Sequence, residues 1–86
     1  MKQLTCTLVS PDAQLFRGEV WQVSVPAASG RFAIRTGHVP VVASVAEGVV
    51  EIARSEEQRM HFKVTDAVIA LKENNCSIIC ESAESV

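Results

Sequence analysis

The strongest constraint on the fold of this chain is a two-residue alternation of apolar side chains in short runs. Leu4, Cys6 and Leu8 alternate with threonines, and Phe62 and Val64 alternate with polar residues. Successive side chains of a strand point to opposite faces of a sheet, so this period predicts strands with one buried face. Turn residues separate such runs roughly every eight to twelve residues, and no stretch keeps a helical period. We therefore predict an all-β fold, a flattened β-sandwich or barrel of about eight to ten short, mostly antiparallel strands.

Length and composition narrow the class of protein further. The chain has 86 residues, and we expect residues 1–86 to form a single domain with a small core. The net charge is −2 and the cations are scattered singly, whereas a nucleic-acid-binding protein usually carries a basic stripe. No run approaches the roughly 18–20 apolar residues of a membrane span, and the N-terminus lacks the pattern of a signal peptide. With three cysteines that do not form a disulfide framework, these features favour a cytoplasmic location.

Several segments receive specific assignments. The stretch Phe16 to Val25 is expected to be a strand whose phase slips, with a bulge near Gly18 to Gln22. Pro26 to Ser29 is expected to be a loop. Val41 to Val45 is a nearly continuous apolar run that is too short for a helix, and it is expected to be a central strand. Ser82 to Val86 is expected to be a frayed tail.

A strand, a tight loop and the start of another strand follow one another between Gly30 and Pro40. Phe32 and Ile34 are two residues apart, so they share one face of a short strand. Gly30 and Gly37 flank that strand at positions where the backbone can take positive φ at low cost. This organisation places a polar residue, His38, at the loop.

The cysteines are expected to be structural. Cys76 to Cys80 is expected to be the strand that closes the sheet, which puts these two thiols on one face about 13 Å apart. That separation is too large for a disulfide or a shared metal ion, and the position of Cys6 relative to them stays open. Free cysteine is among the most buried residue types, so we expect core thiols and no metal site.

His38 is the one residue that suggests a site. It has no nucleophile beside it, and no serine lies in the context of a nucleophile elbow, so catalysis is not expected. Two interpretations remain: an imidazole that bonds nearby backbone and holds the loop, or a surface contact to a partner. The glycines do not form a phosphate cradle, because no helix N-terminus follows them. We therefore expect no cofactor.

The residues around Gly30 resemble the signature G-x-(F/L)-(G/A)-I-x-x-G-H-x-P of the epsilon subunit of rotary ATP synthases. In this chain the signature reads Gly30-x-Phe32-Ala33-Ile34-x-x-Gly37-His38-x-Pro40. The flanks match the family as well, at Val9-Ser10, Phe16-x-Gly18, Val23-x-Val25 and Gly48-x-Val50-x-Ile52. The resemblance covers nearly the whole chain, and its specificity comes from the full set in this order.

The resemblance implies a flattened sandwich of about ten short strands, and this number agrees with the strand pattern. It also implies that the domain has no catalytic site. Members of the family lie at the foot of the central stalk, where they bind the gamma subunit and rest on the membrane rotor ring of c subunits. It implies contacts with gamma through Ser10, His38 and Ala43, and contacts with the c-ring through Ser29, Gly30 and Arg31. The chain is then expected to be peripheral, at the cytoplasmic face of a bacterial inner membrane rather than at the stromal face of a thylakoid.

Three features depart from the family pattern. The family usually carries an acidic residue at the position of Arg31, and it commonly carries a Gly-Gly pair at the position of Asp66-Ala67. Full-length relatives also continue into a helical hairpin that can block ATP hydrolysis, and this chain is expected to lack that arm. The alternative to a rotor subunit is a free-standing β-barrel module that binds a small ligand or peptide. Such a module should have a concave apolar pocket, whereas a rotor subunit should have apolar patches on its outer faces.

Overall fold

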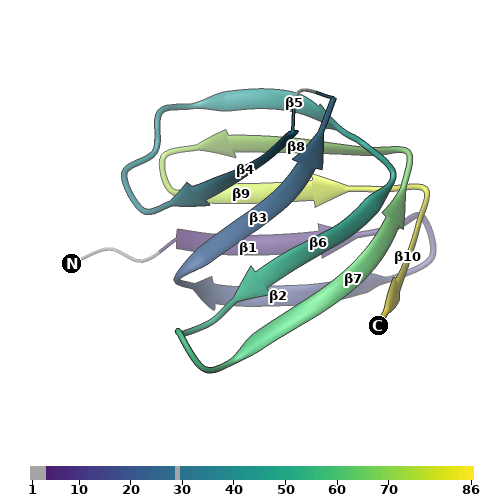
Figure 1. Ribbon diagram of the computed structural model, residues 1–86, viewed down its shortest axis with the longest axis horizontal. Helices are drawn as coiled ribbons and strands as arrows, with labels where there is room; N and C mark the ends of the chain where they lie inside the picture. The colour runs from purple at the N-terminus through teal and green to yellow at the C-terminus, as the bar shows by residue number, and fades with distance from the viewer. Residues whose placement is uncertain (1–3, 29) are drawn as a thin grey trace.

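The computed structural model of the protein describes residues 4–28 and 30–86, and in these ranges it contains strands and turns but no helix. The strands in chain order are β1 (Leu4–Val9), β2 (Gln14–Val20), β3 (Gln22–Ala27), β4 (Gly30–Arg35), β5 (Val41–Val45), β6 (Gly48–Ala53), β7 (Arg59–Thr65), β8 (Ala67–Lys72), β9 (Asn75–Ile79) and β10 (Ser82–Ser85). Figure 1 shows them in two layers. The prediction of an all-β sandwich is confirmed.

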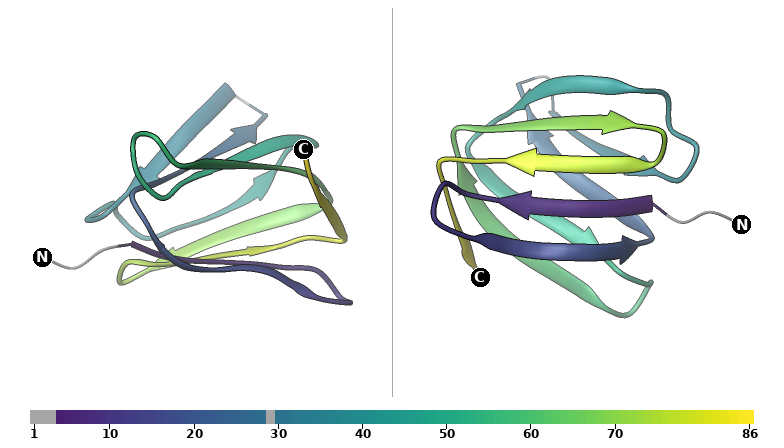
Figure 2. Two further views of the ribbon diagram at one scale, coloured as in Figure 1. Left: turned by 90° about the horizontal axis from the view of Figure 1, so that it is seen from below. Right: turned by 180° about the vertical axis from the view of Figure 1, so that it is seen from behind.

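The two layers are five-stranded sheets that pack face to face. Sheet A has the order β2-β1-β9-β8-β5, and sheet B has the order β10-β7-β6-β3-β4. Sheet B lies at the front of Figure 1, and the right-hand view of Figure 2 shows sheet A from behind. The strand pairs are antiparallel except for β1 and β9, which run in the same direction.

The core lies between the sheets and consists of one face of each. In β1 the predicted alternation is present, because Leu4, Cys6 and Leu8 are fully buried while the threonines between them are half-buried. In sheet B, Val50 and Ile52 are fully buried in the same cluster. Full burial of one aliphatic side chain of this size stabilises the fold by about 1.5–3 kcal/mol. Aliphatic residues can therefore hold the two sheets together with few aromatic ones.

The prediction of one bulged strand from Phe16 to Val25 was wrong. The chain bends at Trp21, so that β2 belongs to sheet A and β3 to sheet B. Val20 and Val23 are both buried, one from each sheet. The slip in the apolar phase therefore marks the passage of the chain from one layer to the other, where the inward direction reverses.

Two strands occupy different places in sheet A than predicted. Val41 to Val45 forms β5, which is the edge strand of sheet A rather than a central one. The strand expected to close the sheet ends at Ile79, and as β9 it lies in the middle of sheet A between β1 and β8. An apolar run indicates that both faces of a strand avoid water. It does not reveal whether the strand has neighbours on both edges, or whether another protein covers its outer face.

Two further segments are more regular than predicted. Residues 82–85 form β10, which pairs with β7, so the expected frayed tail is part of sheet B. Pro26 and Ala27 belong to β3 rather than to a loop. The pairing of β3 with β6 extends only from Gln22 to Ser24, so the missing N–H of Pro26 leaves no hydrogen bond of that ladder unmade.

Candidate interaction surfaces

The outer face of sheet A carries exposed apolar side chains. Val42, Val68 and Ile79 are 76%, 44% and 59% exposed. Val68 and Ile79 are direct cross-strand partners, and Val9 is the partner of Ile79 on the other side. These four residues, which we call the apolar face, thus span four neighbouring strands (Figure 2, right). Val9, Ile79 and Val68 form one row, and Val42 lies in the next row, opposite Ala70. Exposed apolar surface of this kind is typical of interaction sites.

The remaining outward positions of these strands are small and uncharged over most of the sheet. Thr7 and Ser77 are partners, Ser77 pairs with Ala70, and Ala70 pairs with Val42. Among the outward residues of β1, β9, β8 and β5, the one charge is that of Lys72 at the end of β8. The sequence did contain a signal for this face. In the apolar runs of β5, β8 and β9, apolar residues occur at outward positions as well as at inward ones.

The three residues matched to gamma contacts do not form a cluster. Ser10 follows β1 and His38 precedes β5, and these two strands run in the same direction through sheet A. Ser10 and His38 therefore lie at opposite ends of sheet A, with the apolar face between them. Ala43 is half-buried and packs against the core, while its neighbour Val42 points outward.

His38 has the role of a loop-holding imidazole. Its backbone N–H donates to the carbonyl of Arg35 at 3.1 Å, and its Nδ1 lies 2.7 Å from the carbonyl oxygen of Val39. The same loop is joined to the β8–β9 turn, because the N–H of Gly37 donates to Oδ1 of Asn74 at 2.9 Å. Gly37 has φ of 86°, as predicted for this position. Whether His38 also contacts a partner stays a prediction.

The residues matched to the c-ring contact lie at the hairpin between β3 and β4. Gly30 has the predicted positive φ, 121°, and Arg31 is exposed on the outer side of sheet B. The guanidinium of Arg31 donates to Ser24, from Nε to Oγ at 3.3 Å and from Nη2 to the carbonyl at 3.2 Å. Ser29 lies outside the described residues.

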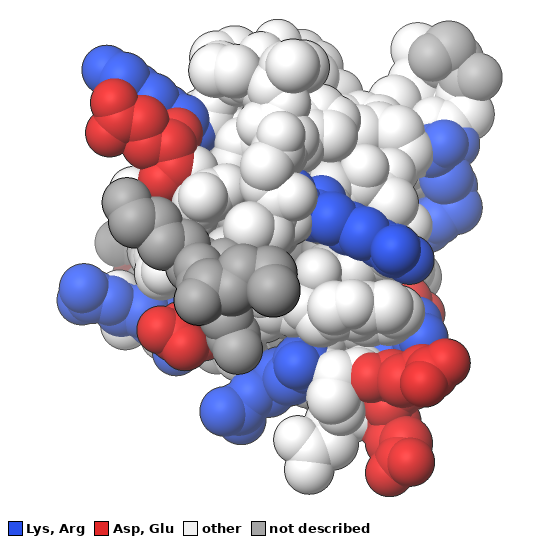
Figure 3. All heavy atoms as spheres, turned by 90° about the vertical axis from the view of Figure 1, so that its left-hand side faces the viewer, with Lys and Arg blue, Asp and Glu red and all other residues white. Residues whose placement is uncertain are grey.

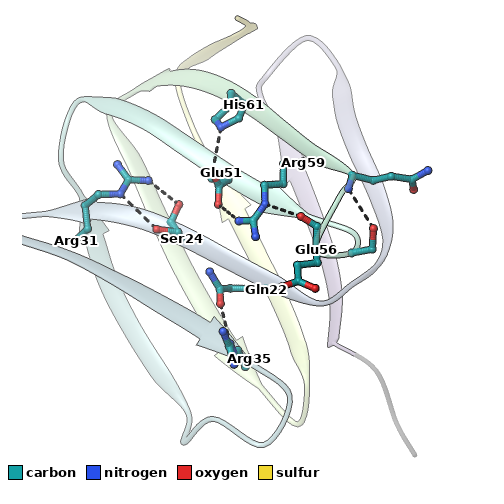
Figure 4. Close-up of polar contacts among 10 residues, drawn as sticks. Gln22, Ser24, Arg31, Arg35, Glu51, Glu56, Arg59 and His61 are labelled. Atoms are coloured by element: carbon teal, nitrogen blue, oxygen red, sulfur yellow. Dashed lines mark hydrogen bonds and ion pairs between the residues drawn. The ribbon is translucent and has the colours of Figure 1, made fainter.

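The outer face of sheet B also holds a polar cluster that sequence reasoning missed (Figure 4). Glu51 accepts from Nη1 of Arg59 at 2.8 Å, and its other oxygen lies 3.0 Å from Nε2 of His61. Partial desolvation acts to raise the pKa of the Glu51 carboxyl, but the hydrogen bonds from Arg59 and His61 outweigh it and lower that pKa. The guanidinium groups of Arg35 and Arg59 lie 4.6 and 5.7 Å from the centre of the Trp21 ring.

The three cysteines are buried free thiols, as predicted. Cys6 and Cys76 are direct partners on the parallel strands β1 and β9, and the hydrogen bond to the Cys76 thiol together with burial raises the pKa of Cys6. Cys80 lies just beyond β9, where its thiol donates to the carbonyl of Val9 at 3.3 Å. In residues 4–28 and 30–86, no three His, Cys, Asp or Glu side chains are grouped to hold a metal ion.

A shallow pocket of about 240 Å³ lies where β6 begins and β7 ends, whereas Trp21 lies at the other end of these strands, where its backbone N–H donates to the carbonyl of Ala53. Five of the six residues that line the pocket are polar or charged: the lining consists of Glu47, Lys63, Thr65, Ser82, Ala83 and Glu84. Ligand pockets are commonly about 300–1,000 Å³ and mostly apolar, so this hollow is not of that kind. Helices of the length and apolar character needed to cross a membrane are absent from the described part of the chain.

Comparison with known proteins gives consistent matches along the chain. The family model described as "ATP synthase, Delta/Epsilon chain, beta-sandwich domain" matches residues 3–86. The ATP synthase epsilon chain of Chelativorans sp. (strain BNC1) is 32% identical over 85 residues, which cover 99% of this chain and 63% of that relative. The ATP synthase epsilon chain of Leptospira borgpetersenii serovar Hardjo-bovis (strain JB197) is 34% identical over 79 residues, with 92% and 61% coverage. This chain thus spans less than two thirds of the length of either relative.

Two solved structures share the fold. A chain of the mitochondrial ATP synthase of Euglena gracilis, solved as OSCP/F1/c-ring, superposes with a TM-score of 0.90 at 16% identity, covering 96% of this chain and 53% of that one. A chain of the central stalk/c-ring of the Tetrahymena thermophila mitochondrial ATP synthase superposes with a TM-score of 0.84 at 12% identity, covering 96% and 66%. At these identities, the likeness concerns the fold.

Proposed function

Because this chain belongs to the family of β-sandwich domains of ATP synthase delta/epsilon chains, we propose that it is an epsilon-type rotor subunit of the central stalk. In this role it binds the gamma subunit and the c-ring and couples proton flow to ATP synthesis, and it catalyses no reaction itself. Its place is peripheral, at the cytoplasmic face of a bacterial inner membrane. We propose that residues 1–86 act as one domain in this role.

The observation that carries the proposal is the apolar face of sheet A. Val68 and Ile79 are side by side on this outer face, and Val42 lies one row away, opposite Ala70. Burial of these side chains by a partner would stabilise an assembly. We propose that gamma covers this face. Ser10 and His38 lie at its two ends, so a partner that spans the face could touch both without their being close together.

The alternative of a free-standing ligand-binding module receives less support. Such a module needs a concave apolar pocket with a few convergent polar groups. The described hollow at Thr65 and Ser82 is shallow and lined mainly by polar side chains. Three exposed apolar residues, Val42, Val68 and Ile79, lie on a sheet face instead, which suits a protein partner better than a small molecule.

The second contact of the proposed subunit is with the c-ring, through Ser29, Gly30 and Arg31 at the β3–β4 hairpin. Gly30 is exposed, and a Cβ placed on it would meet no atom within 4 Å, so close approach of another backbone is not blocked by this chain. Arg31 brings a positive charge to this contact, so the facing part of the ring has to be compatible with a cation.

The proposal is tested by mixing the chain with its cognate gamma subunit and measuring complex formation by size-exclusion chromatography. We expect a stable complex for the unaltered chain and its loss for Ile79→Asp, which puts a charge in the middle of the apolar face. The matched control is Val49→Asp, which puts the same charge at an outward position of β6 in sheet B, opposite Lys63. Failure of the unaltered chain to bind gamma, or equal loss for both variants, would contradict the proposal.

A further inference from the structure

Two arginines on the outer side of β4 lack an acidic partner within the described chain. The guanidinium of Arg31 is held by Ser24, and that of Arg35 donates from Nε to Oε1 of Gln22 at 2.7 Å (Figure 4). Both acceptors are neutral, and no ion pair joins either arginine to a carboxylate of residues 4–28 and 30–86. Since the guanidinium group stays charged at any physiological pH, each of these sites keeps a full positive charge at the surface.

Other cations on the same face differ in this respect. Arg59 is paired with Glu51 and also donates to the carbonyl of Glu56 at 3.0 Å. Lys63 lies directly opposite Glu84 across the β7–β10 ladder. Among the arginines on the strands of sheet B, all in the described residues, Arg59 thus has a carboxylate partner and the two on β4 have none, although the chain as a whole carries a net charge of −2.

The side chain of Arg35 is ordered for binding before any partner arrives. Its guanidinium stacks over the ring of Trp21 at 4.6 Å, while Gln22 fixes its Nε. These contacts leave the two terminal nitrogens of Arg35, which can receive a carboxylate in a two-point hydrogen bond. Because the side chain is already held, less conformational entropy is lost on binding.

An exposed tryptophan beside arginines is typical of the residues that dominate binding energy at protein interfaces. Trp21 is 38% exposed, at the bend between the sheets. Arg31 and Arg35 are about 13 Å apart along the strand, and small side chains, Ala33 and Ser24, lie between them. We call this set the arginine–tryptophan surface: Trp21, Ser24, Arg31, Ala33 and Arg35.

We propose that the arginine–tryptophan surface binds an acidic protein segment, with one carboxylate at Arg35 and a second at Arg31. Figure 3 looks onto the end of the molecule that is on the left in Figure 1 and shows basic side chains interspersed with acidic and uncharged ones, without a continuous basic stripe. A nucleic acid, with its closely spaced phosphates, needs such a stripe, whereas two separate carboxylates do not. The proposal goes beyond the rotor assignment and shares with it only Arg31, and its test uses neither gamma nor the ring.

The test uses the fact that Trp21 is the only tryptophan of a chain without tyrosine. The intact chain is titrated with a short peptide of glutamate and glycine while tryptophan fluorescence is recorded, at about 10 mM salt where screening is weak. We expect a saturable change in emission, and no change with a peptide of lysine and glycine. Binding should weaken by about two- to fivefold in Arg35→Gln and in Arg31→Gln, as measured for exposed ion pairs.

The matched controls are Arg17→Gln on β2 and Lys72→Gln at the end of β8, which remove the same charge on sheet A. They should leave peptide binding unchanged, and thermal unfolding of each variant checks that it is folded. No saturable change, equal weakening by Arg17→Gln, or binding of anionic lipid vesicles or DNA in place of the peptide would overturn the proposal. Failure of the unaltered chain to bind gamma would instead contradict the rotor assignment. It would leave the result of the peptide titration unaffected.

Discussion

At the scale of the residue, Glu51 is the point where the polar contacts of sheet B converge. Its two oxygens bind Arg59 and His61, which come from the neighbouring strand β7. The three side chains lie on the outer face, so their contribution is that of partly exposed ion pairs rather than of a buried network. The lowered pKa of Glu51 makes this contribution dependent on pH.

We expect Glu51→Gln to lower the free energy of unfolding by about 1 kcal/mol near pH 7. A carboxyl whose pKa is lower in the folded state stabilises the fold above its unfolded pKa of about 4.3, and that stabilisation is lost as the pH falls through the folded pKa. Urea unfolding at about pH 7 and about pH 3 measures the difference, which should shrink at the lower pH. Glu57→Gln, at the exposed β6–β7 turn, is the control and should change little. A Glu51→Gln effect of equal size at both pH values would contradict the expectation.

Asp66 shows a different residue-scale feature, a strained backbone. It has φ of 48° in the turn between β7 and β8, and the resemblance to the epsilon family places glycine at this position. We expect Asp66→Gly to raise the free energy of unfolding by about 0.5–1 kcal/mol, because glycine has no Cβ to clash in the left-handed region. Equilibrium unfolding in urea measures it. Asp12→Gly, in a turn residue without positive φ, is the control, and a gain of the same size there would argue against the backbone explanation.

At the scale of the element, β10 completes sheet B. It covers the edge of β7 from Phe62 to Thr65, and beyond it the N–H of Val86 donates to the carbonyl of His61 at 3.0 Å. Ala83 is partly buried and packs against the core, opposite Val64. Without this strand, β7 would present an unpaired edge to solvent.

We therefore expect removal of residues 82–86 to lower the free energy of unfolding by about 1–3 kcal/mol, through lost strand hydrogen bonds and lost cover of the core. The exposed edge of β7 should also promote aggregation. Thermal unfolding followed by circular dichroism, together with light scattering, measures both effects. Ser85→Ala, which keeps the strand, should behave like the unaltered chain. Unchanged stability after the truncation would mean that β10 contributes nothing to the fold.

At the scale of the whole molecule, the two outer faces differ in chemistry. The outer face of sheet A carries the apolar face, whereas the outer face of sheet B carries charged side chains and Trp21. Between them lies the buried core. Neighbouring residues of one strand thus have unrelated roles: Ile78 is fully buried and Ile79 is 59% exposed.

The pair Ile78→Ala and Ile79→Ala tests this division. Ile78→Ala should lower the free energy of unfolding by about 2–4 kcal/mol, because it leaves a cavity in the core. Ile79→Ala should change it by less than about 0.5 kcal/mol and should instead weaken retention on a hydrophobic-interaction column. Urea unfolding and column retention are measured for both. Destabilisation of similar size in both variants would mean that Ile79 belongs to the core and that the apolar face is not free.

The local features of the fold were determined by the sequence alone. Alternation predicted the buried face of β1, and the glycines at the ends of the strand with Phe32 and Ile34 predicted the positive φ found there, 121° at Gly30 and 86° at Gly37. The motif around Gly30 and His38 indicated the family that the match over residues 3–86 confirms. These features depend on residues that are close along the chain, so a short window of sequence contains their physical cause.

Which strands lie side by side was decided only by the tertiary structure. A two-residue period is the same in an edge strand and in a central one, so it could not place β5 at an edge, β9 in the middle, or β10 beside β7. Nor could it bring Trp21 under both Arg35, from the β3–β4 hairpin, and Arg59, from β7. The pairs β1–β9, β5–β8, β3–β6 and β7–β10 join strands remote in sequence, and such pairing is selected by the packing of the whole core rather than by any local pattern.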